Sequence, residues 1–471
     1  MIIGTSGCSI YRKYKQPDMK TVTDSLFRHT QEQTDTASIA ALSWREIFTD
    51  SQLQQLIDTG LKNNTDLNIA RLKVKEAEAL LMTSRLSYLP SISLSPQGTL
   101  NKAEKSKLTK SYNLAVSADW EIDIFGRVTN AKREAKAVLE QSEAYRQAVQ
   151  TQLVATIANS YYTLLMLDEQ LEISRRTAEN WSENLRVMKA LKKAGQTTDM
   201  AVAQTEASKL SVDASLLSIE RQITETENAL CALLGSTPET ISRSTLKQQK
   251  FPDTLSVGIP LQLLHRRPDV RQSEAALAAA FYVTNQAHSA FYPSITLSGS
   301  AGWTNAAGAV ISNPGQWLFS AIGSLVQPLF NRGQNIANLK VAKAQQEEAL
   351  LSFKQSLLDA GTEVNDALLQ WQTARKRHNL NKQQITSLES AVRSSELLMR
   401  YSSQNYLEVL TARQTLLQAE LDAVSDCFEA RMSACALTSR HVPCRHSAIP
   451  DGWRSPASSA SSIISQRMWR S

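Results

Sequence analysis

The sequence has no long apolar run. No stretch of about 18 or more consecutive apolar residues, the minimum for a membrane-spanning helix, occurs in its 471 residues. A helical membrane protein is therefore excluded. A β-barrel is not excluded, because the strands of a barrel carry apolar residues on one face only. Cysteines are also few, and the number and spacing of the five present do not predict a disulfide framework.

An excess of one charge is lacking over most of the chain. The net charge is +6, but residues 427–471 hold six arginines against Glu429 and Asp451 and supply +4 of it. The rest is close to neutral, so no nucleic-acid partner is expected. The six histidines are scattered, and no phosphate-binding glycine loop or nucleophile motif occurs. The sequence predicts neither an enzyme nor a cofactor.

The most informative feature is an internal repeat. A helical pattern that begins at Asp66 runs to the segment Pro-Ser-Ile-Ser-Leu at 90–94, and one that begins at Asp269 runs to Pro-Ser-Ile-Thr-Leu at 293–297. Further matching segments follow both at similar offsets. Each repeat is predicted to be a helix, two strands, a long helix, a turn and a returning helix.

The repeat divides the chain into parts. Residues 1–60 are predicted to form an N-terminal equatorial segment, followed by the first repeat at 61–250 and the second at 251–426. Residues 427–471 differ in composition, with three of the five cysteines and a serine-rich end, and are predicted to lie outside the fold. The residues of this tail that approach a zinc-ligand spacing do so by chance in our interpretation, and no metal site is predicted; they are Cys435, His441, Cys444 and His446.

Alternation with a period of two marks the strands. They are predicted at about 91–101, 112–124, 294–303 and 316–327. Tryptophans lie within or at the ends of these segments, where aromatic side chains meet lipid headgroups. An edge of a soluble sandwich is the alternative. Strand lengths of about ten residues and a polar second face favour a membrane barrel.

Three carboxylates follow one another on the polar positions of the second strand. They are Asp119, Glu121 and Asp123. If the intervening Trp120 and Ile122 face lipid, the three line the pore or the collar below it. A calcium site is conceivable here, but a wet acidic lining is the preferred interpretation.

Four strands are too few to close a barrel, since about eight is the smallest number whose interior side chains still fit. An open sheet edge in lipid would leave backbone groups unpaired, at several kcal/mol each. Copies of the chain must therefore supply the missing strands. Three copies give twelve strands, although the pattern alone also permits two or four.

Residues 127–194 contain no glycine or proline, and 334–401 contain only Gly361. Each segment predicts a helix of roughly 100 Å, far longer than a globular core needs. Their apolar stripes are narrow, which suits the wall of a hollow tube with water on both sides, or alternatively a solvated coiled-coil rod. Asp66 and Asp269 are predicted to be helix N-caps.

Specific motifs carry a family resemblance over the chain up to about Asp426. They include Trp-Glu-Ile-Asp-Ile-Phe-Gly-Arg at 120–127, Leu-His-Arg-Arg-Pro-Asp-Val at 264–270 and Tyr-Leu-Glu-Val-Leu at 406–410. The sequence resembles the TolC-like outer membrane factors, in their NodT-type efflux lipoprotein branch. The resemblance implies a homotrimer in the bacterial outer membrane, with a shared β-barrel and a periplasmic α-helical barrel, that conducts small-molecule or metal cargo passively.

The resemblance also implies partners and site residues. The partners are outer membrane lipid, a periplasmic adaptor and, through it, an inner-membrane resistance-nodulation-division pump. The implied lipidation site is Cys8, although the seven residues before it are too few for an apolar signal segment of roughly 7–15 residues. We expect either a start site further upstream or a chain that was trimmed at this end. The implied periplasmic gate comprises Glu408, Thr411 and Asp199, and the implied hairpin tips for adaptor docking comprise Gly195, Thr198, Ser402 and Asn405.

Two rival functions remain at this point. One is the outlet of a type I protein secretion system. The other is a structural coiled-coil lipoprotein of the envelope, which would leave the strand pairs without a purpose.

Overall fold

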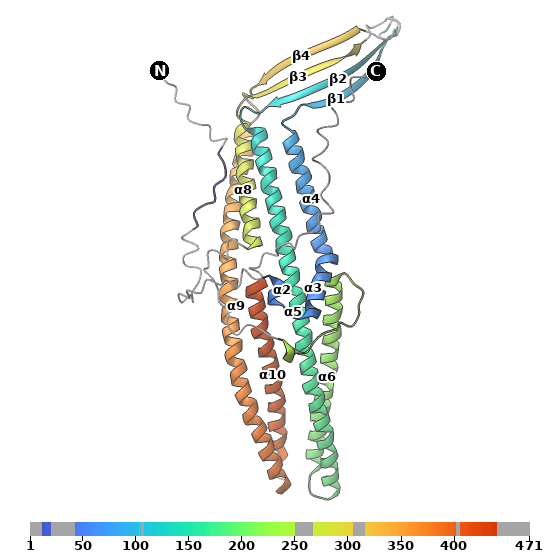
Figure 1. The fold of residues 1–471 in the computed structure, drawn as a ribbon, viewed down its shortest axis with the longest axis vertical. Helices are drawn as coiled ribbons and strands as arrows, with labels where there is room; N and C mark the ends of the chain where they lie inside the picture. The colour runs from blue at the N-terminus through green and yellow to red at the C-terminus, as the bar shows by residue number, and fades with distance from the viewer. Residues whose placement is uncertain are drawn as a thin grey trace.

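The computed structural model describes residues 12–19, 43–102, 104, 108–249, 267–304, 316–401 and 406–439. A sheet lies at one end of a long bundle of helices, and two helical hairpins form the other end (Figure 1). The first repeat contains α4 (Thr65–Leu86), β1 (Ser91–Asn101), β2 (Thr109–Ile122), α5 (Arg127–Lys193) and α6 (Asp199–Leu234). The second contains α8 (Pro268–Ser289), β3 (Ser294–Thr304), β4 (Gln316–Val326), α9 (Gln334–Tyr401) and α10 (Tyr406–Ser439).

The predicted order of elements in each repeat is confirmed. The two long helices, α5 and α9, have 67 and 68 residues. The shorter helices lie one after the other along them, α4 and then α6 beside α5, and α8 and then α10 beside α9 (Figure 1). Neighbouring helices in the half next to the sheet follow the order α4, α5, α8, α9, and in the other half α6, α5, α10, α9. No helix within the described ranges combines the length and hydropathy needed to cross a membrane.

The four strands form one antiparallel sheet in the order β1-β2-β3-β4. Its register aligns Ser93, Ser117, Ser300 and Ser320 in one row across all four strands. The opposite face is apolar and exposed, and includes Ile92, Leu94, Val116, Trp120, Leu297, Trp317, Phe319 and Leu325. β1 and β4 are the two edge strands, so the sheet has a serine-bearing face, an apolar face and two edges. On β4 the serine-bearing face also carries the exposed Leu318, Ile322 and Val326.

Strands β2 and β3 approach each other closely at Gly302. A Cβ atom at this position would overlap the carbonyl oxygen of Leu114 and the Cα atom of Ala115. Glycine is required here because the obstacle is backbone, which no rotamer change can move aside.

The middle of the bundle carries a collar, which we define as residues 43–63, with α2 (Trp44–Ile47) and α3 (Ser51–Asn63), and residues 241–249, with the short helix η3 (Leu246–Gln248). The collar packs against α5 in the largest apolar cluster of the described residues. Trp44, Phe48, Leu53 and Ile57 contribute from the collar.

Two predicted helix caps are wrong. Asn64 caps α4, because its side chain accepts a hydrogen bond from the Leu67 N–H at 3.0 Å, and Asp66 lies inside the first turn. At α8, Pro268 is the first helical residue, a position where its missing N–H costs nothing. Asp269 therefore lies inside the first turn as well, where it accepts from the Val270 N–H at 3.0 Å.

The predicted boundary at Cys427 is also wrong for residues 427–439. Helix α10 continues to Ser439, because Phe428 and Met432 recur at helical spacing and pack against the collar cluster. Arg431 Nη1 donates to the carbonyl oxygen of Leu246 at 2.9 Å, which fixes this end of α10 to the collar. Residues 440–471 lie outside the described residues.

Candidate functional site

The turn between α5 and α6 forms the first hairpin tip. Gly195 has a left-handed φ of 73°, and its N–H donates to the Lys192 carbonyl at 3.0 Å. Thr198 then caps α6 by accepting from the Ala201 N–H at 3.3 Å. Asp199 forms an ion pair with Lys192 across the turn. These contacts reverse the chain within a few residues and give the tip a fixed shape.

The second hairpin tip is described from Tyr406 onward. The predicted docking residues Ser402 and Asn405 lie outside the described residues. Glu408 is exposed in the first turn of α10, while Val409 and Leu410 beside it are buried. The Thr411 hydroxyl donates to the Leu407 carbonyl at 2.9 Å, back along its own helix. Of the predicted gate residues, Glu408 therefore points away from the hairpin core.

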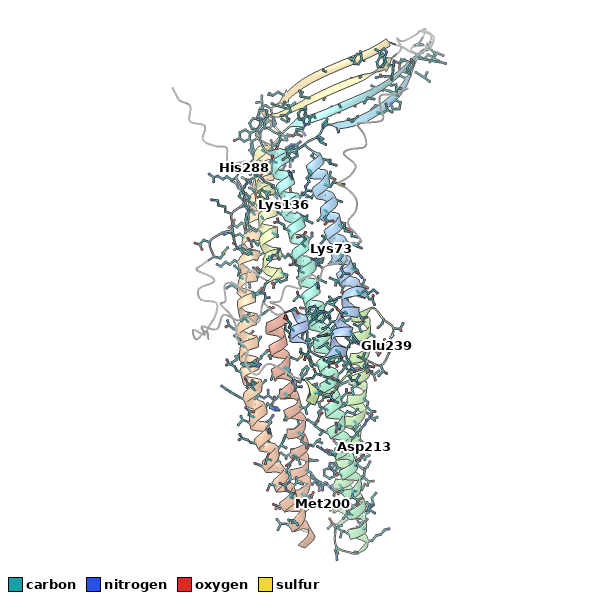
Figure 2. The ribbon with its side chains drawn as sticks, in the orientation of Figure 1. Lys73, Lys136, Met200, Asp213, Glu239 and His288 are labelled. Carbon is teal, nitrogen blue, oxygen red and sulfur yellow. The ribbon has the colours of Figure 1, made fainter. Side chains whose placement is uncertain are left out.

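Two exposed apolar residues at the tips were missed by the sequence reasoning. Met200 is 74% exposed and Leu407 is 59% exposed, each at the second position of its helix. Figure 2 places Met200 at the end of the molecule opposite the sheet. The signal was present in the repeat, since these two residues occupy equivalent positions in the two halves.

The two hairpins are joined above their tips. Leu410 of α10 packs into a cluster with Trp181 of α5 and Val202 of α6. An ion pair of 2.9 Å joins Arg176 of α5 to Glu420 of α10. These contacts hold the tips of the two repeats side by side.

The Asp50 carboxylate is the hydrogen-bonding centre of the collar. Its Oδ2 accepts from the Tyr161 hydroxyl at 2.6 Å, the Ser244 hydroxyl at 2.5 Å and the Gln249 amide at 2.8 Å, while Oδ1 accepts from the Gln52 N–H at 2.9 Å. Burial acts to raise the pKa of Asp50, but these hydrogen bonds outweigh it and the pKa is lowered. Burial and Asp50 together raise the pKa of the Tyr161 phenol to about 12, so it stays a donor.

We expect Asp50→Asn to lower the free energy of unfolding at neutral pH by about 1–3 kcal/mol, because it removes charge-assisted hydrogen bonds. A lowered pKa means that this stabilisation is present above the unfolded-state value and is lost as the pH falls through the folded-state value. The gap between wild type and variant, measured by tryptophan fluorescence in denaturant, should therefore close in acid. Asp58→Asn is the control, since Asp58 forms only an exposed ion pair with Arg45 and should change stability by less than about 1 kcal/mol.

The three predicted lining carboxylates have different surroundings. Asp119 lies on β2 and accepts from the Ser298 hydroxyl at 2.6 Å. Glu121 also lies on β2 and pairs with Arg127, whose Nε is 2.7 Å away. Asp123 is beyond the strand, and its carboxylate accepts from the N–H groups of Val128 and Thr129 at 3.0 and 2.7 Å. The prediction that all three share one strand face is therefore wrong for Asp123, because the strand ends at Ile122. The N-cap of α5 is Gly126, and the Asp123 carboxylate accepts from free N–H groups of the first turn.

Comparison with known proteins decides the family. A model of the family described as outer membrane efflux protein matches residues 56–236 and 259–428, well over half of the chain. The chain belongs to the outer membrane efflux protein family. The first matched region corresponds to the first repeat and the second matched region to the second repeat.

Relatives of this outer membrane efflux protein agree in length and fold. The cation efflux system protein CusC of Escherichia coli O6:H1 is 28% identical over 422 residues, which cover 88% of this chain and 91% of CusC. The probable outer membrane lipoprotein SilC of Salmonella typhimurium is 30% identical over 378 residues, covering 79% and 82%. The open-state crystal structure of the MtrE outer membrane channel of Neisseria gonorrhoeae matches with a TM-score of 0.81 and 27% identity, covering 92% of this chain and 98% of MtrE.

These findings confirm the predicted fold class and the predicted family. This outer membrane efflux protein is a channel protein of the bacterial outer membrane that reaches into the periplasm, and its family and relatives are channels, not enzymes. Efflux is therefore favoured over a purely structural coiled-coil role. The predicted lipidation site, Cys8, lies outside the described residues.

Proposed function

We propose that three copies of this chain form the outlet duct of a tripartite efflux assembly. The main support for this proposal is the sheet, which has four strands, two edge strands and an exposed apolar face. In lipid, the edges β1 and β4 need partners, and those of sister copies have the matching length and antiparallel sense. Twelve strands then close a barrel with the serine-bearing face toward the lumen.

The collar belongs on the outside of the proposed duct. Its apolar cluster covers one face of α5, and a collar on the inner side would occupy the lumen. The opposite face of α5 then faces the interior. Cargo moves along this interior passively, driven by an inner-membrane pump of the resistance-nodulation-division class, and the chain itself carries no catalytic activity or cofactor.

The partners follow from the two ends. A periplasmic adaptor docks on the hairpin tips, which comprise Gly195, Thr198, Ser402 and Asn405 together with the exposed Met200 and Leu407. Outer membrane lipid surrounds the sheet, and a lipid chain on Cys8 anchors the N-terminus. Nucleic acid is not among the proposed partners.

Glu408 is proposed to form the inner gate. Three such carboxylates around one axis attract cations and repel anions at the periplasmic entrance, and Thr411 and Asp199 are proposed to belong to the same gate. We expect Glu408→Ala to weaken the preference for cations and to raise the conductance of the closed duct. Single-channel recording in planar bilayers measures both, and an unchanged cation preference would remove Glu408 from the gate.

The cargo class is small molecules or metal cations. A named relative, CusC, is a cation efflux system protein, and the proposed acidic entrance supports cationic cargo here. Deleting the gene and measuring susceptibility to antibiotics, detergents, dyes and metal salts tests the function. Unheated gel electrophoresis of the membrane fraction tests the duct: a heat-sensitive band of three chains is expected, and a monomer that extracts without detergent would refute it.

A further inference from the structure

A cavity of about 630 Å³ lies in the helical wall near the collar, within the size range of small-molecule sites. It is lined by the start of α4, the middle of α5, the end of α6 and the start of α8, together with Glu363 of α9. It thus lies where the two repeats meet, at the junctions of the stacked short helices. It is distinct from the tips and from the sheet.

The centres of the cavity and of the collar cluster lie on opposite sides of α5, and Val149 and Leu153 at their shared border belong to both. The cavity is lined by Tyr145, Val149, Gln152 and Thr156, which form one stripe at helical spacing. A second stripe, formed by Val154, Ala158, Tyr161 and Leu165, packs in the collar cluster. Residues nine apart are separated by about 180° around a helix. If the collar is outside, the cavity therefore opens toward the lumen.

Arg267, which lines this cavity, carries a donor without a partner among the described residues. Its side chain is 4% exposed, and its Nη2 donates to Asp269 at 2.6 Å and to Glu363 at 2.7 Å. Nη1 is buried without any hydrogen-bond acceptor among the described residues. Burial opposes the charge, but the two ion pairs outweigh it and the pKa of Arg267 is raised. A permanently charged, buried N–H group without an acceptor is costly, and a ligand that supplies an acceptor would remove that cost.

Acidic groups outnumber Arg267 around the cavity. Among the described residues, Asp66, Asp269 and Glu363 line it together with one basic residue, Arg267, which leaves two negative charges in excess. Asp66 is exposed in the first turn of α4 and is not needed as its cap, which is Asn64. Apolar side chains form the rest of the wall, including Ile69, Val149 and Leu233.

We propose that this cavity binds an amphiphilic organic cation that also carries a hydrogen-bond acceptor. The cation lies near Asp66 and Asp269, the acceptor accepts from Arg267 Nη1, and the apolar body contacts Ile69 and Val149. Binding depends only on the cavity. Its role as a resting site for cargo in transit depends on the proposed duct function.

Rhodamine 6G is a suitable probe, because it is a fluorescent cation with an ester carbonyl. Fluorescein has the same tricyclic body but is an anion at neutral pH. We expect fluorescence anisotropy with the purified full-length protein in detergent to show saturable binding of rhodamine 6G and none of fluorescein. Equal binding of both dyes, or of neither, would overturn the proposal.

Two variants locate the bound dye. Asp66→Asn removes one negative charge from the lining and should weaken rhodamine 6G binding about fivefold, while Glu78→Gln, an equal charge change on an exposed part of α4 outside the cavity, should not. Ile69→Trp fills the cavity without a charge change and should abolish saturable binding. Wild-type affinity in both Asp66→Asn and Ile69→Trp would overturn the site.

Conductance separates the two proposals. A protein that conducts ions in planar bilayers but binds no rhodamine 6G would refute the cavity site and leave the duct intact. A protein that binds the dye with the expected variant effects but never conducts would refute the duct and leave the site.

Discussion

Replacing Gly302 by valine should abolish assembly of the barrel. The new Cβ would overlap the Leu114 carbonyl and the Ala115 Cα on the neighbouring strand, so β2 and β3 would have to separate. Because the obstacle is backbone, we expect a cost of about 4 kcal/mol or more. The heat-sensitive band of the assembled protein should disappear from unheated gels, and susceptibility should match that of the gene deletion.

Gly98→Val is the matched control. Gly98 lies on β1 in the same sheet, and a Cβ there would have nothing within 4 Å. This variant should assemble and complement the deletion like the wild type. A normal assembled band for Gly302→Val would show that β2 and β3 tolerate separation, and it would contradict the described register.

The double variant Met200→Asp, Leu407→Asp should lose efflux without losing the duct. Both side chains are exposed at the tips, so their proposed partner is the adaptor, and a carboxylate buried in that interface would be strongly unfavourable. The helices themselves should tolerate the change, because an aspartate in the first turn is favourable toward the helix dipole. We expect full susceptibility, with assembly and conductance as in the wild type.

A conservative exchange provides the control for the tips. Met200→Leu with Leu407→Met keeps both positions apolar and should retain most resistance. Resistance that survives the double aspartate variant would place adaptor docking elsewhere on the helices. Loss of the assembled band in that variant would instead show that the two residues stabilise the trimer.

The helices and strands were predictable from the sequence, because their signals are local. The alternation of Tyr112 to Ile124 indicated a strand, and the absence of glycine and proline from 127–194 indicated one long helix, which α5 confirms. The doubled motif gave the order of elements in both repeats. The family resemblance rested on the same segments, and the family model matches them.

The errors arose where a residue had more than one possible partner. Asp123 continues the alternation of β2 in sequence, yet its carboxylate accepts from free N–H groups in the first turn of α5 because the chain turns after Ile122. Asp66 was predicted to cap α4, but the Leu67 N–H donates to the side chain of Asn64 instead. The unusual composition after Cys427 led to the prediction that this segment lies outside the fold. Its two apolar residues, Phe428 and Met432, have helical spacing and pack against the collar cluster.

The sequence by itself determined the repeat, the helix lengths and the strands, because periodicity and the turns that interrupt it depend on neighbours along the chain. Only the tertiary structure decided the cavity at Arg267, the hydrogen-bonding centre at Asp50 and the close approach at Gly302. Each of these joins groups far apart in sequence: Arg267 with Glu363, Asp50 with Tyr161 and Ser244, and Gly302 with Leu114. Such pairings depend on how the helices and strands pack, and no local pattern encodes them.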